Sequence, residues 1–402
     1  MDSDGQTEPA TGLPADWPQP DPDALALSQT LAQRLRERIT QLGPLPFDAW
    51  MESVLYEPGL GYYSAGQEKF GEAGDYVTAP GVSSAFGWTL AAQCAEGLTA
   101  ADGDTILELG PGDGGLAADM LAELERLGQL PAQYWLLERS GELRARQKAR
   151  LQEAVPHLLD RVAWLDGLPE RPLRGVIVAN EVLDALPVAL FRRDASGVSE
   201  WCVSAAAEGF TWQLAPARAS VAHAVAAIEA DLGEALPEGY TSEVCLQLPA
   251  FVASLAECLE QGWLLLLDYG YQRTEYYRPD RNTGTLVCHY RHRAHWDPLP
   301  VPGLQDLSAF VDFTAAALAA DDAGLAVLGF ATQAQFLLGA GITERLEQES
   351  VTEPVAQARL AQQAKTLLLP GAMGERFRVL AAGTAAMPTP GGFSLYNQLA
   401  SL

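Results

Sequence analysis

Short apolar segments alternate with helical segments from residue 104 onward, and this alternation is the feature that most restricts the fold. Strands separated by helices favour an α/β protein with a mostly parallel sheet and helices on both of its faces. The predicted strands lie at 105–109, 134–137, 162–165, 176–179, 263–267, 325–330 and 377–381.

The segments outside this alternation are of three kinds. Residues 1–23 contain six acidic residues, five prolines and no Lys or Arg, which indicates a disordered acidic tail. Apolar residues at helical spacing then predict two helices, at about 25–42 and 47–57. We therefore divide the chain into the tail at 1–23, N-terminal helices with a covering loop at 24–100, an α/β domain at 101–385 and a C-terminal tail at 386–402. Insertions into the α/β domain are expected at about 190–248 and 271–320.

A glycine-rich turn follows the first strand of the α/β domain and reads Glu-Leu-Gly-Pro-Gly-Asp-Gly-Gly at 108–115. Gly110 and Gly112 let the backbone turn tightly and approach a ligand, and the next helix presents free N–H groups. Ligands of open α/β sheets bind at the carboxyl ends of the strands. The turn therefore predicts a nucleotide-like cofactor, and Gly110, Gly112 and Gly115 also satisfy the dinucleotide pattern G-x-G-x-x-G.

Acidic residues around this turn favour S-adenosylmethionine over NAD. Glu108 ends the strand, where its carboxylate can face an ammonium or sulfonium group. Asp113 lies where a pyrophosphate would sit and would repel it. Glu138 ends the second strand and can accept hydrogen bonds from ribose hydroxyls, which both cofactors carry. A tight turn that binds nothing would leave the glycines and the strand-end acids without a purpose.

The fourth and fifth strands also end in polar residues. Asn180, Glu181 and Asp184 follow the fourth strand, next to the first strand, where a substrate would meet the cofactor. We assign Asn180 to the cofactor and Glu181 and Asp184 to catalysis, although Asn180 or Asp184 can instead cap a short helix. Asp268, after the fifth strand, is a third catalytic candidate, and a structural bond to a neighbouring loop is an equal alternative.

The loop at 61–87 is rich in Gly, Ser, Thr and aromatic residues, and such long loops are usually functional or disordered. We expect it to fold over the cofactor, with Asp75 and Thr78 as cofactor contacts. A packed loop without ligand contacts is the alternative.

Composition excludes several classes of function. The 26 Lys and Arg residues against 52 Asp and Glu give a net charge of −26, which argues against a nucleic-acid partner. No apolar run approaches the ~20 residues that cross a bilayer. The five cysteines show no C-x-x-C spacing, and the acidic N-terminus is unlike a secretory or mitochondrial signal. We expect reduced thiols, a cytoplasmic location and no metal site.

One segment departs from this acidity. Residues 269–295 contain five arginines and only two acidic residues, interleaved with tyrosines, and three histidines at 289, 292 and 295. Such a pattern can bind single-stranded nucleic acid, but the overall charge favours a solvated loop or a docking surface for an acidic protein. The histidines are expected to be structural or to contact a partner, because no further ligands complete a metal set.

Motifs in a fixed order cover most of the chain. They include Gly-Tyr-Tyr-Ser at 61–64, Gly-Asp-Tyr-Val-Thr-Ala-Pro at 74–80, the turn at 108–112, the segment at 180–187, Leu-Asp-Tyr-Gly-Tyr at 267–271, Val-Asp-Phe-Thr at 311–314 and Met-Gly-Glu-Arg-Phe at 373–377. In these motifs the sequence resembles the MidA family, whose mitochondrial members are complex I assembly methyltransferases.

The resemblance implies a class I methyltransferase (Rossmann-like) fold with an N-terminal helical arm, inserted substrate segments, and S-adenosylmethionine as methyl donor. It also implies an arginine of a respiratory complex I subunit as acceptor, which carboxylates such as Glu181 and Asp184 could hold bidentately. One departure concerns the acceptor: Gly81 and Ser84 stand where the family usually has Glu and often has Gln.

Other functions are compatible with the same residues. A non-catalytic assembly factor would keep the fold and dock a partner, an NAD dehydrogenase would use the glycine turn differently, and a small molecule could replace the protein acceptor. The inserted segments are also compatible with a homodimer.

Overall fold

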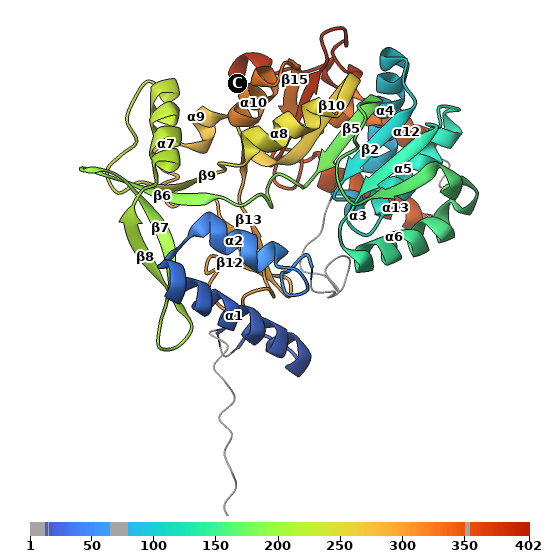
Figure 1. The fold of residues 1–402 in the computed structure, drawn as a ribbon. Helices are drawn as coiled ribbons and strands as arrows, with labels where there is room; N and C mark the ends of the chain where they lie inside the picture. The colour runs from blue at the N-terminus through green and yellow to red at the C-terminus, as the bar shows by residue number, and fades with distance from the viewer. Residues whose placement is uncertain (1–12, 15, 65–78, 350–353) are drawn as a thin grey trace, which may run out of the picture. The chain divides into compact units, whose positions relative to one another are not determined.

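The computed structural model describes residues 13–14, 16–64, 79–349 and 354–402, and the chain forms two compact units (Figure 1). The arm unit comprises Met1–Lys69, Pro187–Leu246 and Pro279–Ala309. The sheet unit comprises Phe70–Leu186, Gln247–Arg278 and Phe310–Leu402. Each unit is therefore built from three separate stretches of chain, whereas our sequence division uses consecutive segments.

The sheet unit is built on an eight-stranded sheet in the order β15-β16-β10-β5-β2-β3-β4, with β14 paired to β10 beside this path. The strands from β4 to β10 run parallel, and β16 is antiparallel to both of its neighbours. The mostly parallel sheet is thus confirmed, because its apolar strands were readable as short runs. Their bounds are β2 Thr105–Leu109, β3 Gln133–Leu137, β4 Val162–Leu165, β5 Leu173–Asn180, β10 Leu259–Tyr271, β14 Val311–Asp312, β15 Ala326–Thr332 and β16 Phe377–Gly383.

Helices cover both faces of this sheet. Ile106, Val176 and Val178 share one buried cluster with residues of α4 and α5. Neighbouring residues such as Ile177 are equally buried and point to the opposite face, since strand side chains alternate. There, α8 and α10 pack on each other and on β10. The helices are α3 Ala79–Val82, α4 Ser84–Ala101, α5 Gly115–Arg126, α6 Gly141–Ala154, α8 Leu248–Glu257, α9 Arg273–Tyr276, α10 Phe313–Asp322, α11 Gln333–Gly339, α12 Ile342–Gln348 and α13 Pro354–Leu368, with 3-10 turns η1 Pro156–Arg161, η2 Gly391–Phe393 and η3 Leu399–Ser401.

The arm unit contains two antiparallel sheets, in the orders β1-β7-β6-β9, with β8 beside β7, and β12-β11-β13. Leu31 and Leu35 of α1 are fully buried in a cluster with Trp50 and Met51 of α2, which confirms the helices predicted from apolar spacing. The elements are α1 Pro22–Leu42, β1 Leu45–Pro46, α2 Phe47–Tyr56, β6 Ala189–Asp194, β7 Gly197–Ala205, β8 Phe210–Pro216, α7 Ala219–Leu232, β9 Thr241–Val244, β11 Val287–Tyr290, β12 Arg293–His295 and β13 Asp306–Ser308.

The N-terminal segment differs in part from the predicted disordered tail. Asp21 caps α1, accepting a hydrogen bond from the Ala24 N–H at 2.9 Å, and Pro22 is the first helical residue. Trp17 contacts Tyr290 of β11. Apolar and charged contacts therefore hold the described part of this segment.

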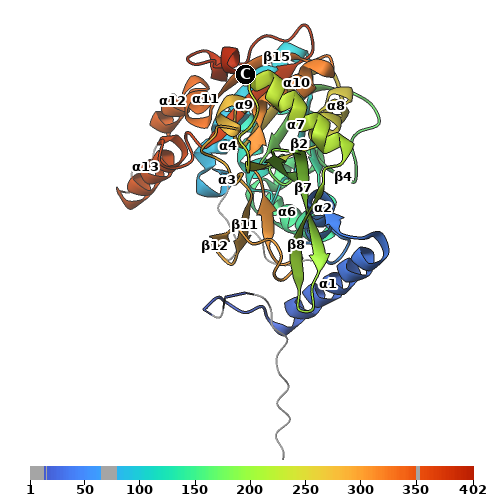
Figure 2. The ribbon, with the colours of Figure 1, turned by 90° about the vertical axis from the view of Figure 1, so that its left-hand side faces the viewer.

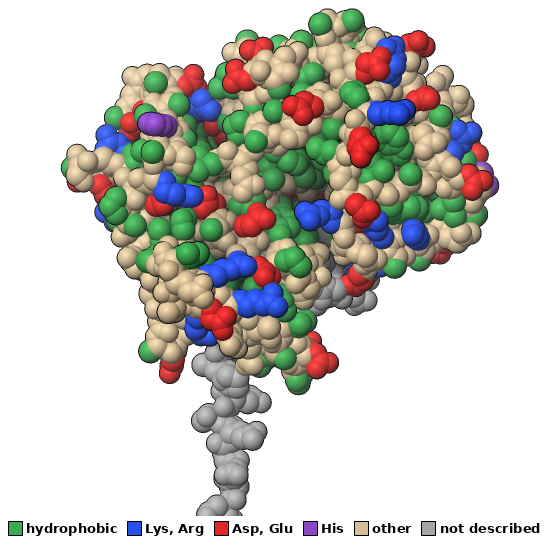
Figure 3. All heavy atoms as spheres, in the orientation of Figure 1, with side chains coloured by type: hydrophobic (Ala, Val, Ile, Leu, Met, Phe, Trp, Pro, Cys, Tyr) green, Lys and Arg blue, Asp and Glu red, His purple; other side chains and the backbone are tan. Residues whose placement is uncertain are grey.

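Charge and hydropathy add two observations. Among the described helices, none is both long enough and apolar enough to cross a bilayer. On the face drawn in Figure 3, basic side chains are scattered among acidic ones and form no continuous patch.

A tight contact between α4 and the sheet gives the first testable prediction. A Cβ on Gly97 of α4 would lie 2.6 Å from both Trp263 and Val176. Gly97→Val should therefore lower the free energy of unfolding by about 2 kcal/mol, because the core cannot expand cheaply. Gly141→Ala is the matched control, since nothing lies within 4 Å of the added Cβ. Chemical denaturation of both variants checks this expectation, and equal stability of the two would contradict it.

Candidate functional site

The glycine turn after β2 has the geometry of a ligand cradle. Gly110, Gly112 and Gly114 have φ of 57°, 54° and 87°, in the left-handed region that favours glycine. The Gly110 N–H donates to the Leu137 carbonyl of β3 at 3.3 Å. A Cβ on Gly110 would lie 3.1 Å from Val182, so the turn passes close to the loop after β5.

Asp113 lies within this turn and binds the start of α5. Its Oδ1 accepts the Gly115 N–H at 2.9 Å, and its Oδ2 pairs with Arg150 at 2.5 Å. The Asp113 carboxylate thus accepts a hydrogen bond from an N–H group at the helix N-terminus. In a dinucleotide enzyme, such N–H groups hold the pyrophosphate. This contact favours S-adenosylmethionine over NAD.

Glu108 is buried beneath the turn. Tyr134 donates its hydroxyl proton to the Glu108 carboxylate at 2.6 Å. Burial raises the pKa of Glu108 to about 7, against the lowering effect of the Tyr134 hydrogen bond and with a smaller raising effect from Asp113. A cation bound near the turn would favour the charged form of this carboxylate.

Glu138 ends β3 and is tied to the turn through a residue that sequence reasoning missed. Gln147 of α6 is fully buried and donates to the Gly112 carbonyl at 2.8 Å and to the Glu138 carboxylate at 3.3 Å. The other Glu138 oxygen accepts the Ser140 N–H at 2.7 Å. Burial raises the pKa of Glu138. No motif surrounds Gln147 in its basic helix, so nothing in the sequence marked it.

The register of the sheet explains why these groups meet. Glu108 pairs with Leu136 of β3 and Val178 of β5, and paired residues of parallel strands share a face. Asn180 comes two residues later on β5, and Glu138 comes two residues after Leu136, directly after β3, so we expect both on the same face as Glu108. Three polar side chains therefore leave adjacent strands on one side of the sheet, at the carboxyl ends.

Asn180 and Glu181 end β5 with an unusual backbone. Glu181 has φ of 53°, a conformation that costs a non-glycine residue energy and recurs at functional sites. Its Oε1 accepts the Ala79 N–H of α3 at 3.2 Å and the Asn180 amide at 3.3 Å. The Asn180 Oδ1 is buried and accepts no hydrogen bond from the described part of the chain.

Asp268, on β10, holds the loop that follows Glu181. It is fully buried, and its Oδ2 accepts three N–H groups, from Val182 at 3.1 Å, Leu183 at 2.9 Å and Asp184 at 3.2 Å. Burial, with the nearby Glu181 charge, raises the pKa of Asp268 to about 8, and the backbone hydrogen bonds oppose this shift. These contacts support the alternative in which Asp268 forms structural hydrogen bonds to a neighbouring loop.

The structure thus brings together eight of the predicted site residues within the sheet unit and places Asp184 on the loop that Asp268 holds. Asp75 and Thr78 lie outside the described residues. Within the described ranges, no cluster of three or more His, Cys, Asp or Glu is suited to hold a metal ion. The eight are Glu108, Gly110, Gly112, Asp113, Glu138, Asn180, Glu181 and Asp268.

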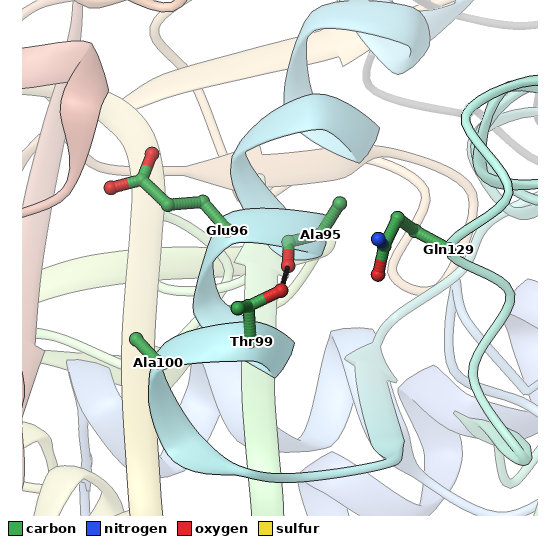
Figure 4. Close-up of a pocket in the computed structure, with 5 residues that line it drawn as sticks. All are labelled: Ala95, Glu96, Thr99, Ala100 and Gln129. Atoms are coloured by element: carbon green, nitrogen blue, oxygen red, sulfur yellow. Dashed lines mark hydrogen bonds between the residues drawn. The ribbon is translucent and has the colours of Figure 1, made fainter.

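A shallow hollow of about 370 Å³ on the sheet unit is a separate feature (Figure 4). Ala95, Glu96, Thr99 and Ala100 of α4 line it together with Gln129. The end of α4 and Gln129 come just before β2 and β3, so the hollow lies near the amino ends of these strands. Glu96 accepts hydrogen bonds from Gln93 and from the Gly391 N–H, which gives it a structural role.

Comparisons with known proteins agree with this geometry. A family model described as S-adenosyl-L-methionine-dependent methyltransferase matches residues 89–331. A crystal structure of a relative from Burkholderia thailandensis bound to S-adenosyl-homocysteine is 42% identical, with a TM-score of 0.91 over 96% of this chain and 100% of that one. "Protein arginine methyltransferase NDUFAF7, mitochondrial" from Mus musculus is 31% identical, and the alignment covers 87% of this chain and 84% of the mouse protein. The same-named protein from Danio rerio is 29% identical over 90% of this chain and 89% of its own length.

The fold and the site define a class I, S-adenosylmethionine-dependent methyltransferase. The chain belongs to the MidA family, which includes the mitochondrial NDUFAF7 proteins. The family resemblance, the fold class and the cofactor predicted from the sequence are therefore confirmed.

The residues present fit that cofactor. Three glycines in left-handed conformations form the cradle, and the buried Asn180 Oδ1 is an acceptor that a ligand N–H or O–H can satisfy. Burial raises the pKa of Glu108 and Glu138, and a cationic ligand offsets that cost. Glu108 would face the cationic part and Glu138 the ribose, as the sequence predicts.

The role of Glu138 leads to a binding prediction. Glu138→Gln should weaken S-adenosylhomocysteine binding about tenfold, because hydrogen bonds to a charged acceptor are stronger than those to an amide. Isothermal titration calorimetry measures the change. Glu153→Gln changes an exposed residue near the end of α6. It is the control and should bind the ligand as the wild type does. Unchanged affinity in Glu138→Gln would remove Glu138 from the cofactor site.

The raised pKa of Glu108 leads to a pH prediction. Its pKa in the folded state, about 7, lies above the ordinary 4.5, so the folded protein holds this proton longer than the unfolded chain does. Stability is then lost as pH rises from about 4.5 to about 7. Glu108→Gln should reduce the fall in unfolding free energy between these pH values by an amount on the order of 2 kcal/mol. Urea unfolding of the ligand-free protein checks this, with exposed Glu170→Gln as control; identical pH curves for wild type and Glu108→Gln would contradict it.

Proposed function

We propose that this protein transfers a methyl group to an arginine side chain of a protein, with a respiratory complex I subunit as the candidate acceptor. The names of the mitochondrial relatives support the acceptor class. The observation that carries the proposal is the strained backbone of the half-buried Glu181 beside the cofactor turn.

The charges at this position suit a guanidinium. Burial raises the pKa of the Asp268 carboxyl group, and the nearby Glu181 charge raises it further, because neighbouring carboxylates disfavour each other's charged form. A cationic acceptor relieves this repulsion, and a guanidinium can pair with a carboxylate through two N–H groups in fixed geometry. The acceptor nitrogen is thereby aimed in one direction.

The chain's own residues then have distinct roles. Bound S-adenosylmethionine supplies the methyl group from its sulfonium. Glu181 binds the acceptor N–H groups and takes up the proton that leaves the methylated nitrogen. Asp184 lies in the same loop as a further carboxylate, and Asp268 acts as a positioning residue that fixes this loop through its three N–H contacts. Such positioning supplies much of the rate in a direct displacement.

The departure from the family pattern lies beside this position. Gly81 is two residues from Ala79, whose N–H binds the Glu181 carboxylate, and Ser84 begins α4. The missing Glu at position 81 would stand close in sequence to the contact between Ala79 and Glu181. We therefore expect the protein acceptor of this enzyme to differ in sequence from that of the mitochondrial relatives.

The cysteines support the cytoplasm as the compartment for this reaction. None of the five forms a disulfide in the part of the chain that the structure describes, and four of them are buried. Reducing compartments keep such thiols free.

Glu181→Gln tests the proposal. It should lower methyl transfer to the subunit at least 100-fold, as the loss of one transition-state contact does, and should leave S-adenosylhomocysteine binding within threefold of wild type. The assay measures methylated arginine by mass spectrometry after incubation of the enzyme with S-adenosylmethionine and a complex I subunit preparation.

Asp322→Asn, exposed at the end of α10, is the control and should be fully active. Full activity in Glu181→Gln would remove this residue from the reaction. Cofactor binding by the wild-type protein without methylation of any subunit peptide would instead identify a non-catalytic assembly factor.

A further inference from the structure

The described part of the N-terminal segment lies against the arginines of the β11–β12 hairpin in the arm unit. Trp17 stacks on Tyr290 of β11 with ring centroids 6.5 Å apart, and meets His295 of β12 edge-on at 4.9 Å. The guanidinium of Arg293 lies 5.5 Å from the Trp17 ring centroid. Three side chains of the hairpin formed by β11 and β12, whose strands are labelled in Figure 2, thus contact the indole.

Acidic residues on both sides of Trp17 pair with this hairpin. Asp16 lies 3.7 Å from Arg293, and Asp21 lies 3.7 Å from Arg291. Arg291 also donates to the Gln19 carbonyl at 3.1 Å. The contact therefore has a defined chemistry, in which carboxylates on both sides of an aromatic ring meet two arginines and an aromatic surface. The protein as a whole carries a net charge of −26.

The hairpin holds its basic residues in a costly conformation. A two-residue turn joins β11 and β12, and both of its residues, Arg291 and His292, have positive φ, of 46° and 65°. Asn and Gly are the usual residues of such turns, because other side chains are strained there. Backbone strain of this kind is retained where the side chains serve a function. Here the turn aims Arg291 at the acidic segment.

The docked segment is held weakly enough to exchange. Both ion pairs are longer than a hydrogen bond, and the arginine side chains are 43% exposed. Exposed pairs of this kind contribute about 0–1 kcal/mol. Among the described residues, the buried apolar cluster beneath Trp17 has four members, Ala24, Tyr290, Val301 and Leu304, and Leu13 also packs against it. The segment is also tethered to α1, which gives it a local concentration on the order of millimolar at the hairpin. This tethering keeps the hairpin occupied although the contacts are weak.

We propose that the β11–β12 hairpin is a docking site for acidic protein segments that carry an aromatic residue, and that residues 16–21 of this chain occupy it as a built-in competitor. A partner segment with the same chemistry displaces residues 16–20 and replaces the pair between Asp21 and Arg291. The other oxygen of Asp21 keeps its cap contact with the Ala24 N–H, so α1 remains in place. The proposal concerns the arm unit and does not depend on the methyl-transfer reaction.

A peptide-binding experiment tests this site in the full-length protein. The probe is a fluorescently labelled, end-capped peptide of residues 13–21, followed by fluorescence anisotropy at low salt. Trp17→Ala in the protein should release the tethered segment, so that the peptide binds this variant at least tenfold more tightly than it binds wild type. Raising the salt concentration should weaken the binding several-fold, because the paired charges are exposed.

Charge reversal gives a second, independent measurement. Asp16→Arg in the protein should expose the site as Trp17→Ala does, without a change in the hairpin. Adding Arg293→Asp to Trp17→Ala should abolish binding of the wild-type peptide and restore binding of a peptide that carries Asp16→Arg. Arg192→Ala, which removes an arginine of β6 that pairs with Asp194 at 2.9 Å, is the control and should behave as wild type.

Two results would overturn the proposal. Equal peptide affinity for wild type and Trp17→Ala would show that the tethered segment does not compete for the site. Failure of the peptide to bind Trp17→Ala and Asp16→Arg at millimolar concentration would show that the hairpin does not recognise this chemistry.

Discussion

The candidate site depends on one buried carboxylate, that of Asp268. Its oxygen accepts the N–H groups of three successive residues, Val182, Leu183 and Asp184, and so fixes the path of the chain after β5. That path places Glu181 in its left-handed conformation and sets Val182 against Gly110 of the cofactor turn. A single hydrogen-bonded anchor thus relates Glu181 to the cofactor turn, and its loss would release the loop between them.

Electrostatics complement this anchor. The sheet unit buries several acids at the carboxyl ends of neighbouring strands, and burial raises the pKa of Glu108, Glu138 and Asp268. The charged form of these carboxylates is unfavourable in the empty site, because they are buried. A bound cation makes the charged form favourable. A sulfonium donor and a guanidinium acceptor are both cations. The same arrangement of acids therefore serves both sides of the reaction that we propose.

Much of this arrangement was predictable because it is local in sequence. The apolar strands, the glycine turn and the acids at the strand ends are each contained in a few consecutive residues, and the register of a parallel sheet brings such ends together. Tyr134 and Gln147 were not predictable as partners of Glu108 and Glu138, since their roles arise from packing between distant segments. The sequence also suggested two roles for Asp268, and only the positions of the three N–H donors favour the structural one. The contact of Trp17 with the hairpin was missed for a similar reason, because acidity and proline content suggested disorder.

The discontinuity of the arm unit has a consequence for the newly made chain. β1 pairs with β7, so Leu45 cannot meet Val203 until that residue has left the ribosome. At about 5–20 residues per second, synthesis of the intervening stretch takes roughly 10 to 30 seconds. During that time the apolar side chains of α2, among them Phe47, Trp50 and Met51, have no sheet to pack against. The part of α2 that contacts β6 and β7 therefore stays uncovered until those strands have been made.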